Sequence, residues 1–288
     1  MRSITQHEIE TFWRDGVVCL REILDPRLVA AMAEPIDALL SEPTMADMSA
    51  MSDALAASGE TVLADVARST TRGTFRSGVD HWRTHEAFRA FSCDSPLPAI
   101  IGEVLKSSKI NLWEDSVLVK EPGTRERTAW HQDIGYFHVE GEQLCTSWIP
   151  LDPVDQASGA MSFVRGSHRG DLYRPNLFVT PMEIPGTQGA TVPDIDALAA
   201  AGDVQLICYE LGPGDATVHH ARTLHGAGGN STTDRRRRAI SVRYCGDDAR
   251  YFIRPGAPKK PHHFTVANGD RLDSDDCPVV WRRDSDHT

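Results

Sequence analysis

Residues 130–133, Trp-His-Gln-Asp, and the distant residues 223–226, Thr-Leu-His-Gly, are the parts of this sequence that indicate most about the fold. In an extended strand, residues i and i+2 project to the same side, so His131 and Asp133 can hold one ion while the intervening glutamine faces away. A His-x-Asp pair combined with a distant histidine, here His225, is typical of the 2-His-1-carboxylate facial triad. That triad binds non-haem Fe(II) and leaves one face of the metal open.

The bulk composition is that of a folded globular protein. The 288 residues carry a formal charge of −11, with 40% hydrophobic and 25% charged residues, which is enough apolar material for a sizeable core. The acidic balance disfavours a nucleic-acid-binding surface. Because the sequence has six scattered cysteines without CxxC spacing, no secretory signal and no long apolar run, we expect a cytoplasmic protein with free thiols and no membrane partner. Its oligomeric state is not indicated.

The N-terminal part is predicted to be mainly helical. Thr5 and Glu8 form a capping-box pattern at the start of a first helix, and Gly16 ends it. A short strand over 17–20 follows. Asp25 then caps a second helix that begins at Pro26, with apolar residues at helical spacing up to Leu40. Residues 42–70 are weakly helical and are interpreted as a flap.

From about residue 109, short strands separated by turns replace the helices. Predicted strands are 110–120, 128–133, 145–151, 160–164, 204–210, 215–219 and 236–244, and residues 166–200 form a long excursion with several prolines. This pattern predicts a mainly β protein with flanking helices and a jelly-roll core. We expect one domain over 1–288, with helical support (1–108), the core (109–250) and a C-terminal extension (251–288).

The chain resembles the phytanoyl-CoA dioxygenase family of Fe(II)/2-oxoglutarate-dependent oxygenases. The resemblance rests on an ordered set of motifs, since any one of them alone is weak. The motifs are residues 118–123 (LVKEPG), 130–133 (WHQD), 159–168 (GAMSFVRGSH), 214–215 (GD), 225–230 (HGAGGN) and 237–241 (RRAIS).

The resemblance implies a double-stranded β-helix core with Fe(II) bound by His131, Asp133 and His225, and with 2-oxoglutarate and O2 as co-substrates. Without it, His219 and His220 remain rivals of His225 for the third position. Strand alternation allows at most one of these two to face inward, and His220 is interpreted as the better supporting residue beside the metal.

Arg237 is expected to bind the distal carboxylate of 2-oxoglutarate, because a planar guanidinium pairs with a carboxylate through two parallel hydrogen bonds. On a strand, Arg237 shares a face with Ala239 and Ser241, whose small side chains leave room for a ligand. The family's Arg-x-Ala pattern also selects Arg237, whereas counting forward from His225 selects Arg236.

The resemblance and strand alternation suggest further ligand contacts. Trp148 lies where the family places a tryptophan against 2-oxoglutarate, and Thr146, on the same face, can hydrogen-bond this co-substrate. Tyr136, Phe137 and His138 follow the metal motif and are candidates for lining the substrate pocket, together with residues of the 166–200 excursion.

The function that the resemblance implies is hydroxylation of an unactivated C–H bond in a small-molecule metabolite or natural-product intermediate, with release of succinate and CO2. Halogenases of this fold lack the carboxylate ligand, so Asp133 favours hydroxylation. Two other classes fit parts of the sequence. One is a non-catalytic jelly-roll protein that binds a ligand. The other is a metal-dependent hydrolase on a cupin-like barrel, which needs a general base beside the metal but not Arg237.

Overall fold

The N-terminal helix begins and ends as its sequence predicts in the computed structural model, which describes residues 2–65 and 71–283. The Thr5 side chain accepts from the Glu8 backbone N–H, and the Glu8 carboxylate accepts from the Thr5 N–H. Helix α1 (Gln6–Asp15) ends at Gly16, whose φ of 79° is the left-handed conformation that glycine adopts without strain. A Cβ at this position would lie 2.5 Å from atoms of His168 and Thr223.

The second predicted helix is broken into two. Asp25 caps α2 (Pro26–Ala30) as expected, but a separate helix, α3 (Ala33–Leu39), follows after a short gap. Pro35 explains the break, because proline has no N–H to donate to the preceding turn and is tolerated in the first turn of a new helix. The 42–70 segment contains α4 (Met48–Ala57), and its residues 66–70 lie outside the described residues.

An eight-stranded sheet forms the larger half of the predicted jelly roll. Its order is β1-β10-β7-β12-β4-β3-β2, with β14 also paired to β4, and the pairings are antiparallel. The strands are β1 (Val17–Leu20), β10 (Ala216–His220), β7 (Leu144–Pro150), β12 (Arg237–Cys245), β4 (Lys109–Lys120), β3 (Phe75–Val79), β2 (Ala46–Asp47) and β14 (Val279–Arg282). Segments predicted as helical support and as an extension therefore contribute strands to the same sheet.

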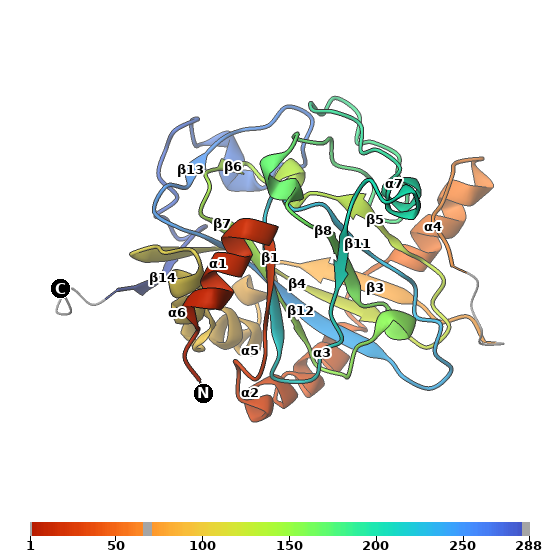
Figure 1. The fold of residues 1–288 in the computed structure, drawn as a ribbon, viewed down its shortest axis with the longest axis horizontal. Coiled ribbons are helices and arrows are strands. Elements are labelled where there is room, and N and C mark those ends of the chain that lie inside the picture. The colour runs from red at the N-terminus through yellow and green to blue at the C-terminus, as the bar shows by residue number, and fades with distance from the viewer. Residues whose placement is uncertain (1, 66–70, 284–288) are drawn as a thin grey trace.

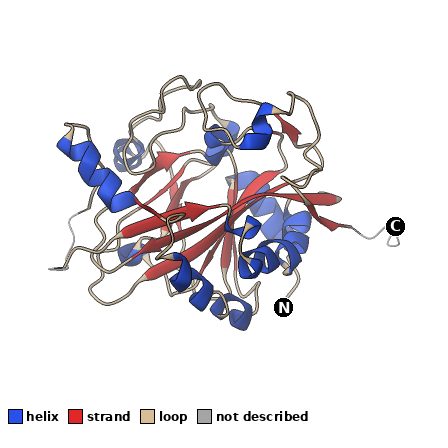
Figure 2. Cartoon of the chain, turned by 180° about the vertical axis from the view of Figure 1, so that it is seen from behind, coloured by secondary structure: helices blue, strands red, loops and turns tan. Residues whose placement is uncertain are grey.

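A four-stranded sheet faces the large one and completes the jelly-roll core (Figures 1 and 2). It contains β5 (Thr128–His131), β11 (His225–Ala227), β8 (Met161–Val164) and β9 (Leu206–Cys208) in that order. Two short strands, β6 (Val139–Glu140) and β13 (Arg250–Tyr251), pair separately. The 166–200 excursion carries the start of α7 (Ile195–Ala201).

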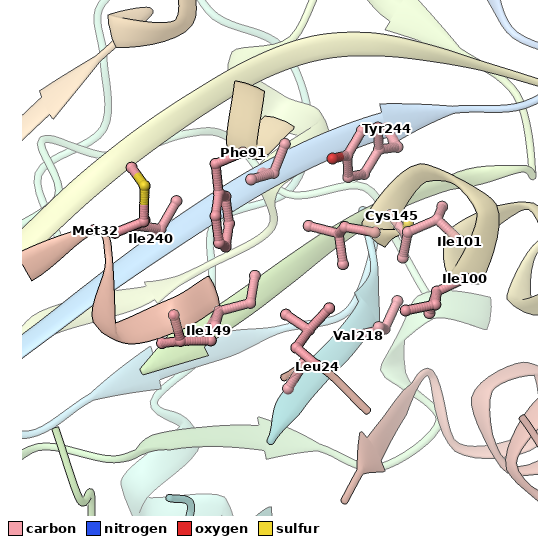
Figure 3. Packing of buried hydrophobic residues seen from close by; sticks show 14 of the residues in the cluster. Leu24, Met32, Phe91, Ile100, Ile101, Cys145, Ile149, Val218, Ile240 and Tyr244 are labelled. Carbon is pink, nitrogen blue, oxygen red and sulfur yellow. The ribbon is translucent and has the colours of Figure 1, made fainter. Parts of the chain in front are cut away.

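Helices cover the other face of the large sheet and bury the main apolar core against it. Figure 3 shows Phe91 from the helical segments near Ile149 and Ile240 of the sheet, and Ile101 beside Cys145. These segments include α5 (Glu86–Arg89), the turn at 90–94 and α6 (Leu97–Val104). Strand alternation thus leaves the opposite face of the same strands free to carry polar side chains. Within the described ranges, no helix has both the length and the apolar character needed to cross a membrane.

Candidate metal centre

His131, Asp133 and His225 meet between the two sheets. His131 ends β5 and is the register partner of His225 on β11. Asp133 opens a 3-10 turn (Asp133–Tyr136), so the predicted strand over 128–133 is two residues shorter than expected. One potential ligand atom from each of the three buried side chains lies within 4.8 Å of the others.

Hydrogen bonds to the backbone fix which nitrogen of each imidazole faces Asp133. His131 Nδ1 is 2.7 Å from the Ala129 carbonyl oxygen, and His225 Nδ1 is 2.9 Å from the Thr223 carbonyl oxygen. Because a carbonyl oxygen can only accept a hydrogen bond, both Nδ1 atoms carry hydrogen, and Nε2 is the nitrogen of each ring that can bind a metal ion. The Nε2 atoms lie 3.6 Å and 3.8 Å from Asp133 Oδ1. This arrangement suits a metal ion held by two nitrogens and one oxygen.

The protonation states also suit a metal ion. Although burial alone would raise it, the pKa of the Asp133 carboxyl is held well below its usual value by His225, His131 and His219. Burial, followed by the neighbouring histidines, lowers the pKa of His225 well below its usual value. The carboxylate is thus stabilised by nearby positive charge, while burial disfavours that charge on the His225 imidazole. A bound metal ion would satisfy both, because metals bind the deprotonated forms of these side chains.

Gln132 turns away from the centre, as predicted. Its side-chain nitrogen donates to the carbonyl oxygens of Asp171 and Arg222, and its side-chain oxygen accepts from the Tyr173 N–H. Gln132 thus ties the His-x-Asp motif to two loops on the outer side.

The second oxygen of Asp133 is held by the large sheet. The Thr146 hydroxyl donates to Asp133 Oδ2, and His219 Nε2 lies 3.4 Å from the same oxygen. Oδ1 is therefore left for the metal. The role of Thr146 toward 2-oxoglutarate stays a prediction, because in this structure its hydroxyl hydrogen points to Asp133.

The choice of His220 as the supporting histidine was wrong. His219 is the register partner of Thr146 and shares its face, whereas alternation turns His220 toward the helices. His220 Nε2 lies 2.8 Å from the Glu142 carbonyl oxygen, and its ring packs against Trp13.

Arg237 lies in the same cavity as the three potential ligands. It is 2% exposed, and among the described residues its guanidinium has no carboxylate within ion-pair distance and its Nε no hydrogen-bond partner. Burial lowers its pKa to about 10. The Trp148 ring lies 5.8 Å from the guanidinium carbon. A buried cation without a partner is costly, so this site fits an anionic ligand.

The neighbouring arginines point elsewhere. Arg236 pairs with Asp37 and Glu121, and Arg238 pairs with Asp152 at 2.8 Å. Strand alternation therefore places Arg237, and not Arg236, in the cavity, in agreement with the Arg-x-Ala count.

Two adjoining cavities share His131 and Asp133 in their linings. The smaller contains Arg237, Trp148 and His225 and has a volume of about 40 Å³. The larger, about 360 Å³, is lined by Tyr136 and Phe137 as predicted for a substrate pocket.

His138 is not part of the described lining of either cavity, contrary to its prediction. Its Nε2 lies 3.0 Å from the Pro258 carbonyl oxygen, and its Nδ1 accepts from the Arg254 N–H. The side chain follows the 3-10 turn and points to the C-terminal segment, where its ring packs on His263.

The sequence interpretation did not name several lining residues, among them Met48 and Arg243, and it expected the 166–200 excursion to contribute without naming Phe178. Phe178 comes from the 166–200 excursion, and its ring centroid lies 5.4 Å from that of His131. Arg243 could have been predicted by continuing the strand alternation from Arg237 through Ser241. The weakly amphipathic segment around Met48 gave no signal.

Comparison with known proteins connects this geometry to a family. The family model described as phytanoyl-CoA dioxygenase (PhyH) matches residues 12–239. A probable phytanoyl-CoA dioxygenase of Caenorhabditis elegans is 27% identical over 54% of this chain and 49% of the relative. A probable alpha-ketoglutarate-dependent hypophosphite dioxygenase of Stutzerimonas stutzeri is 31% identical over 50% of this chain and 46% of the relative.

The match spans about half the length of these two relatives. The fold similarity is more extensive. The solved structure of the epimerase SnoN in complex with Fe3+, alpha-ketoglutarate and nogalamycin RO has a TM-score of 0.68 at 23% identity, covering 96% of this chain and 98% of that one. Because the family model spans most of the chain, the protein belongs to the phytanoyl-CoA dioxygenase (PhyH) family.

Proposed function

We propose that this protein is an Fe(II)- and 2-oxoglutarate-dependent dioxygenase that hydroxylates a C–H bond of a small molecule. The observation that carries the proposal is the combination, in one cavity, of a His-Asp-His triad with a buried arginine that pairs with no carboxylate among the described residues. A binding protein has no need of both features. Bound iron, 2-oxoglutarate and O2 supply the oxidising power for hydroxylation, with succinate and CO2 as co-products.

The side chains of this chain divide the work of binding. His131, Asp133 and His225 would hold the metal ion. Arg237 binds the distal carboxylate of 2-oxoglutarate through its fork of N–H groups, and Trp148 packs beside it. Thr146 keeps Asp133 oriented through the second carboxylate oxygen.

The larger cavity holds the substrate next to the metal. Its walls include Phe137 and Phe178, which exclude water and position the C–H bond. A small-molecule substrate fits a cavity of this size, because such sites typically measure roughly 300–1,000 Å³. We place the enzyme in the cytoplasm, where its free cysteine thiols stay reduced.

Fe(II)-dependent conversion of 2-oxoglutarate to succinate tests this function. We expect succinate release and O2 uptake in protein reconstituted with Fe(II), and their loss in Asp133→Ala. Asp37→Ala is a matched control, since Asp37 pairs with Arg236 and Arg238 outside the cavity. Metal-dependent hydrolysis that needs no 2-oxoglutarate and survives Arg237→Leu would instead indicate a hydrolase.

A further inference from the structure

A second arginine, Arg243, faces the cavity and has no role in the iron and 2-oxoglutarate binding proposed above. It follows Arg237 by six residues on β12 and lies on the same face, so the two Cα atoms are separated by roughly 20 Å along the strand. Arg237 lines only the smaller cavity, whereas Arg243 lines both. Arg243 therefore extends into the space that we assign to the substrate.

Arg243 has only part of the counter-charge that a buried cation needs. Its Nη1 donates to Ser116 Oγ at 2.5 Å and lies 3.7 Å from Glu114 Oε1, which is beyond hydrogen-bond length. The other oxygen of Glu114 lies 2.9 Å from Lys260 Nζ. The Nε of Arg243 is buried and has no hydrogen-bond partner among the described residues.

The acidic groups behind Arg243 are already shared with other cations. Lys260 Nζ lies 2.7 Å from Asp80, and Asp80 lies 3.5 Å from Arg83. Arg83 in turn contacts Asp276 at 2.9 Å, where the Asp276 side chain is 43% exposed. Positive and negative charges thus alternate from the surface inward to Glu114 and Arg243, which both line the larger cavity together with Asp133 of the metal centre.

The rest of the larger cavity is mostly apolar. Leu118, Phe137 and Phe178 line it, and Met48 from α4 adds a flexible apolar side chain. A ligand that fills this space must have an apolar body, since polar groups without partners are costly to bury. An anionic group at one end would complete the charge of Arg243, and a carboxylate matches the planar fork of a guanidinium.

We propose that the substrate is an apolar monocarboxylic acid and that Arg243 binds its carboxylate. This inference rests on the dioxygenase function proposed above and names the class of its substrate. Arg243 is then the residue that selects acids over uncharged molecules of the same shape. It also fixes which part of the apolar body faces the metal.

The test compares acids with their primary amides. The probes are decanoate and decanamide, and adamantane-1-carboxylate and its amide. Dissociation constants are measured by ligand-observed NMR, without O2, on protein loaded with Fe(II) and 2-oxoglutarate so that Arg237 and the metal are occupied. In the wild type we expect at least one acid to bind roughly tenfold or more tightly than its amide, the usual value of a charge-assisted hydrogen bond.

Two variants test whether Arg243 causes the preference for an acid over its amide. Arg243→Gln keeps a donor for Ser116 but removes the charge, and we expect it to bind acid and amide equally. Arg238→Gln is the matched control, since its arginine lies on the same strand with similar side-chain exposure (15% against 14%) but faces away from the cavity. The control should keep the wild-type preference. Thermal unfolding of each variant confirms that it is folded.

Three results would overturn the assignment: equal affinities of each acid and its amide in the wild type, no binding of either acid, or a preference that survives Arg243→Gln. The wild-type comparison stands even if a variant fails to fold. Failure of the proposed function has a different signature, namely the absence of a spectroscopic signal from an iron–2-oxoglutarate chelate. The acid preference can then be measured in metal-free protein, where comparing the wild type with Arg243→Gln separates the contribution of Arg243 from that of the unoccupied Arg237.

Discussion

Along strand β12, Ile240 and Tyr244 pack into the main core beneath the helices, whereas Arg237, Ser241 and Arg243 face the cavity between the sheets. The side chains of the first set pack against apolar neighbours (Figure 3). The second contains buried charges whose partners are missing or shared. Because side chains alternate along the strand, one face of β12 stabilises the fold and the other carries the residues of the candidate site. Each face can therefore be changed with little effect on the other.

Arg237→Leu should give the largest effect on the cavity face. We expect the affinity for 2-oxoglutarate to fall roughly a hundredfold or more, because truncating one partner of a buried charge pair costs about 2–5 kcal/mol. The KM for 2-oxoglutarate in a succinate assay measures this loss. Arg238→Leu should leave that KM unchanged. An unchanged KM in Arg237→Leu would contradict the assignment of the carboxylate site.

Ile240→Ala tests the helix face of the same strand. The side chain is fully buried, so we expect the free energy of unfolding to fall by about 2–5 kcal/mol through lost contacts and a residual cavity. The KM for 2-oxoglutarate should stay near its wild-type value under folding conditions. Urea unfolding measures the first quantity. A loss of 2-oxoglutarate affinity without loss of stability would mean that the two faces are not separate.

Asp115→Asn tests a carboxyl group that lies on the apolar, helix-covered face of the large sheet. Burial, against hydrogen bonds from the Trp82 N–H, raises the pKa of Asp115 to about 7. The native state then holds a proton that the unfolded chain releases near pH 4. The folded wild type is therefore most stable below that pH. Its free energy of unfolding falls by at most about 4 kcal/mol as the pH rises through about 7.

Because asparagine does not titrate, the Asp115→Asn variant should show a flatter pH dependence and should gain stability relative to the wild type at pH 8. Urea unfolding at pH 5 and pH 8 measures the difference. Parallel pH profiles for the two proteins would show that Asp115 is not neutral in the folded state.

Thr146→Val should give the smallest of these effects. It removes the hydroxyl that donates to Asp133 Oδ2 while keeping the shape of the side chain. We expect metal affinity to fall roughly 10- to 100-fold, the usual cost of losing a hydrogen bond to a metal ligand. Competition with a metal chelator measures it. The adjacent Ser147 bonds to the Val242 carbonyl oxygen, so Ser147→Ala should leave metal affinity unchanged.

Much of the site could be predicted because it follows strand alternation. His131 and Asp133 were found from their spacing, and Arg237 from the small residues that share its face. The same rule applied to β10 with a known register would have selected His219, but the sequence does not give the pairing of His219 with Thr146. Phe178 could be predicted only as part of the 166–200 excursion, because a long loop reaches the site through tertiary contacts and not through a strand register. The prediction that His138 lines the substrate pocket was wrong, because the 3-10 turn after Asp133 ends the strand alternation.

The most direct test of the account is an anaerobic titration of metal-free protein with Fe(II) and then 2-oxoglutarate, followed by visible spectroscopy. The weak charge-transfer band of the iron–2-oxoglutarate chelate should appear in the wild type and in His220→Ala, whose histidine faces the helices. It should be absent in His225→Ala. A folded, iron-loaded wild type without the band, or a band that persists in His225→Ala, would contradict the proposed metal centre.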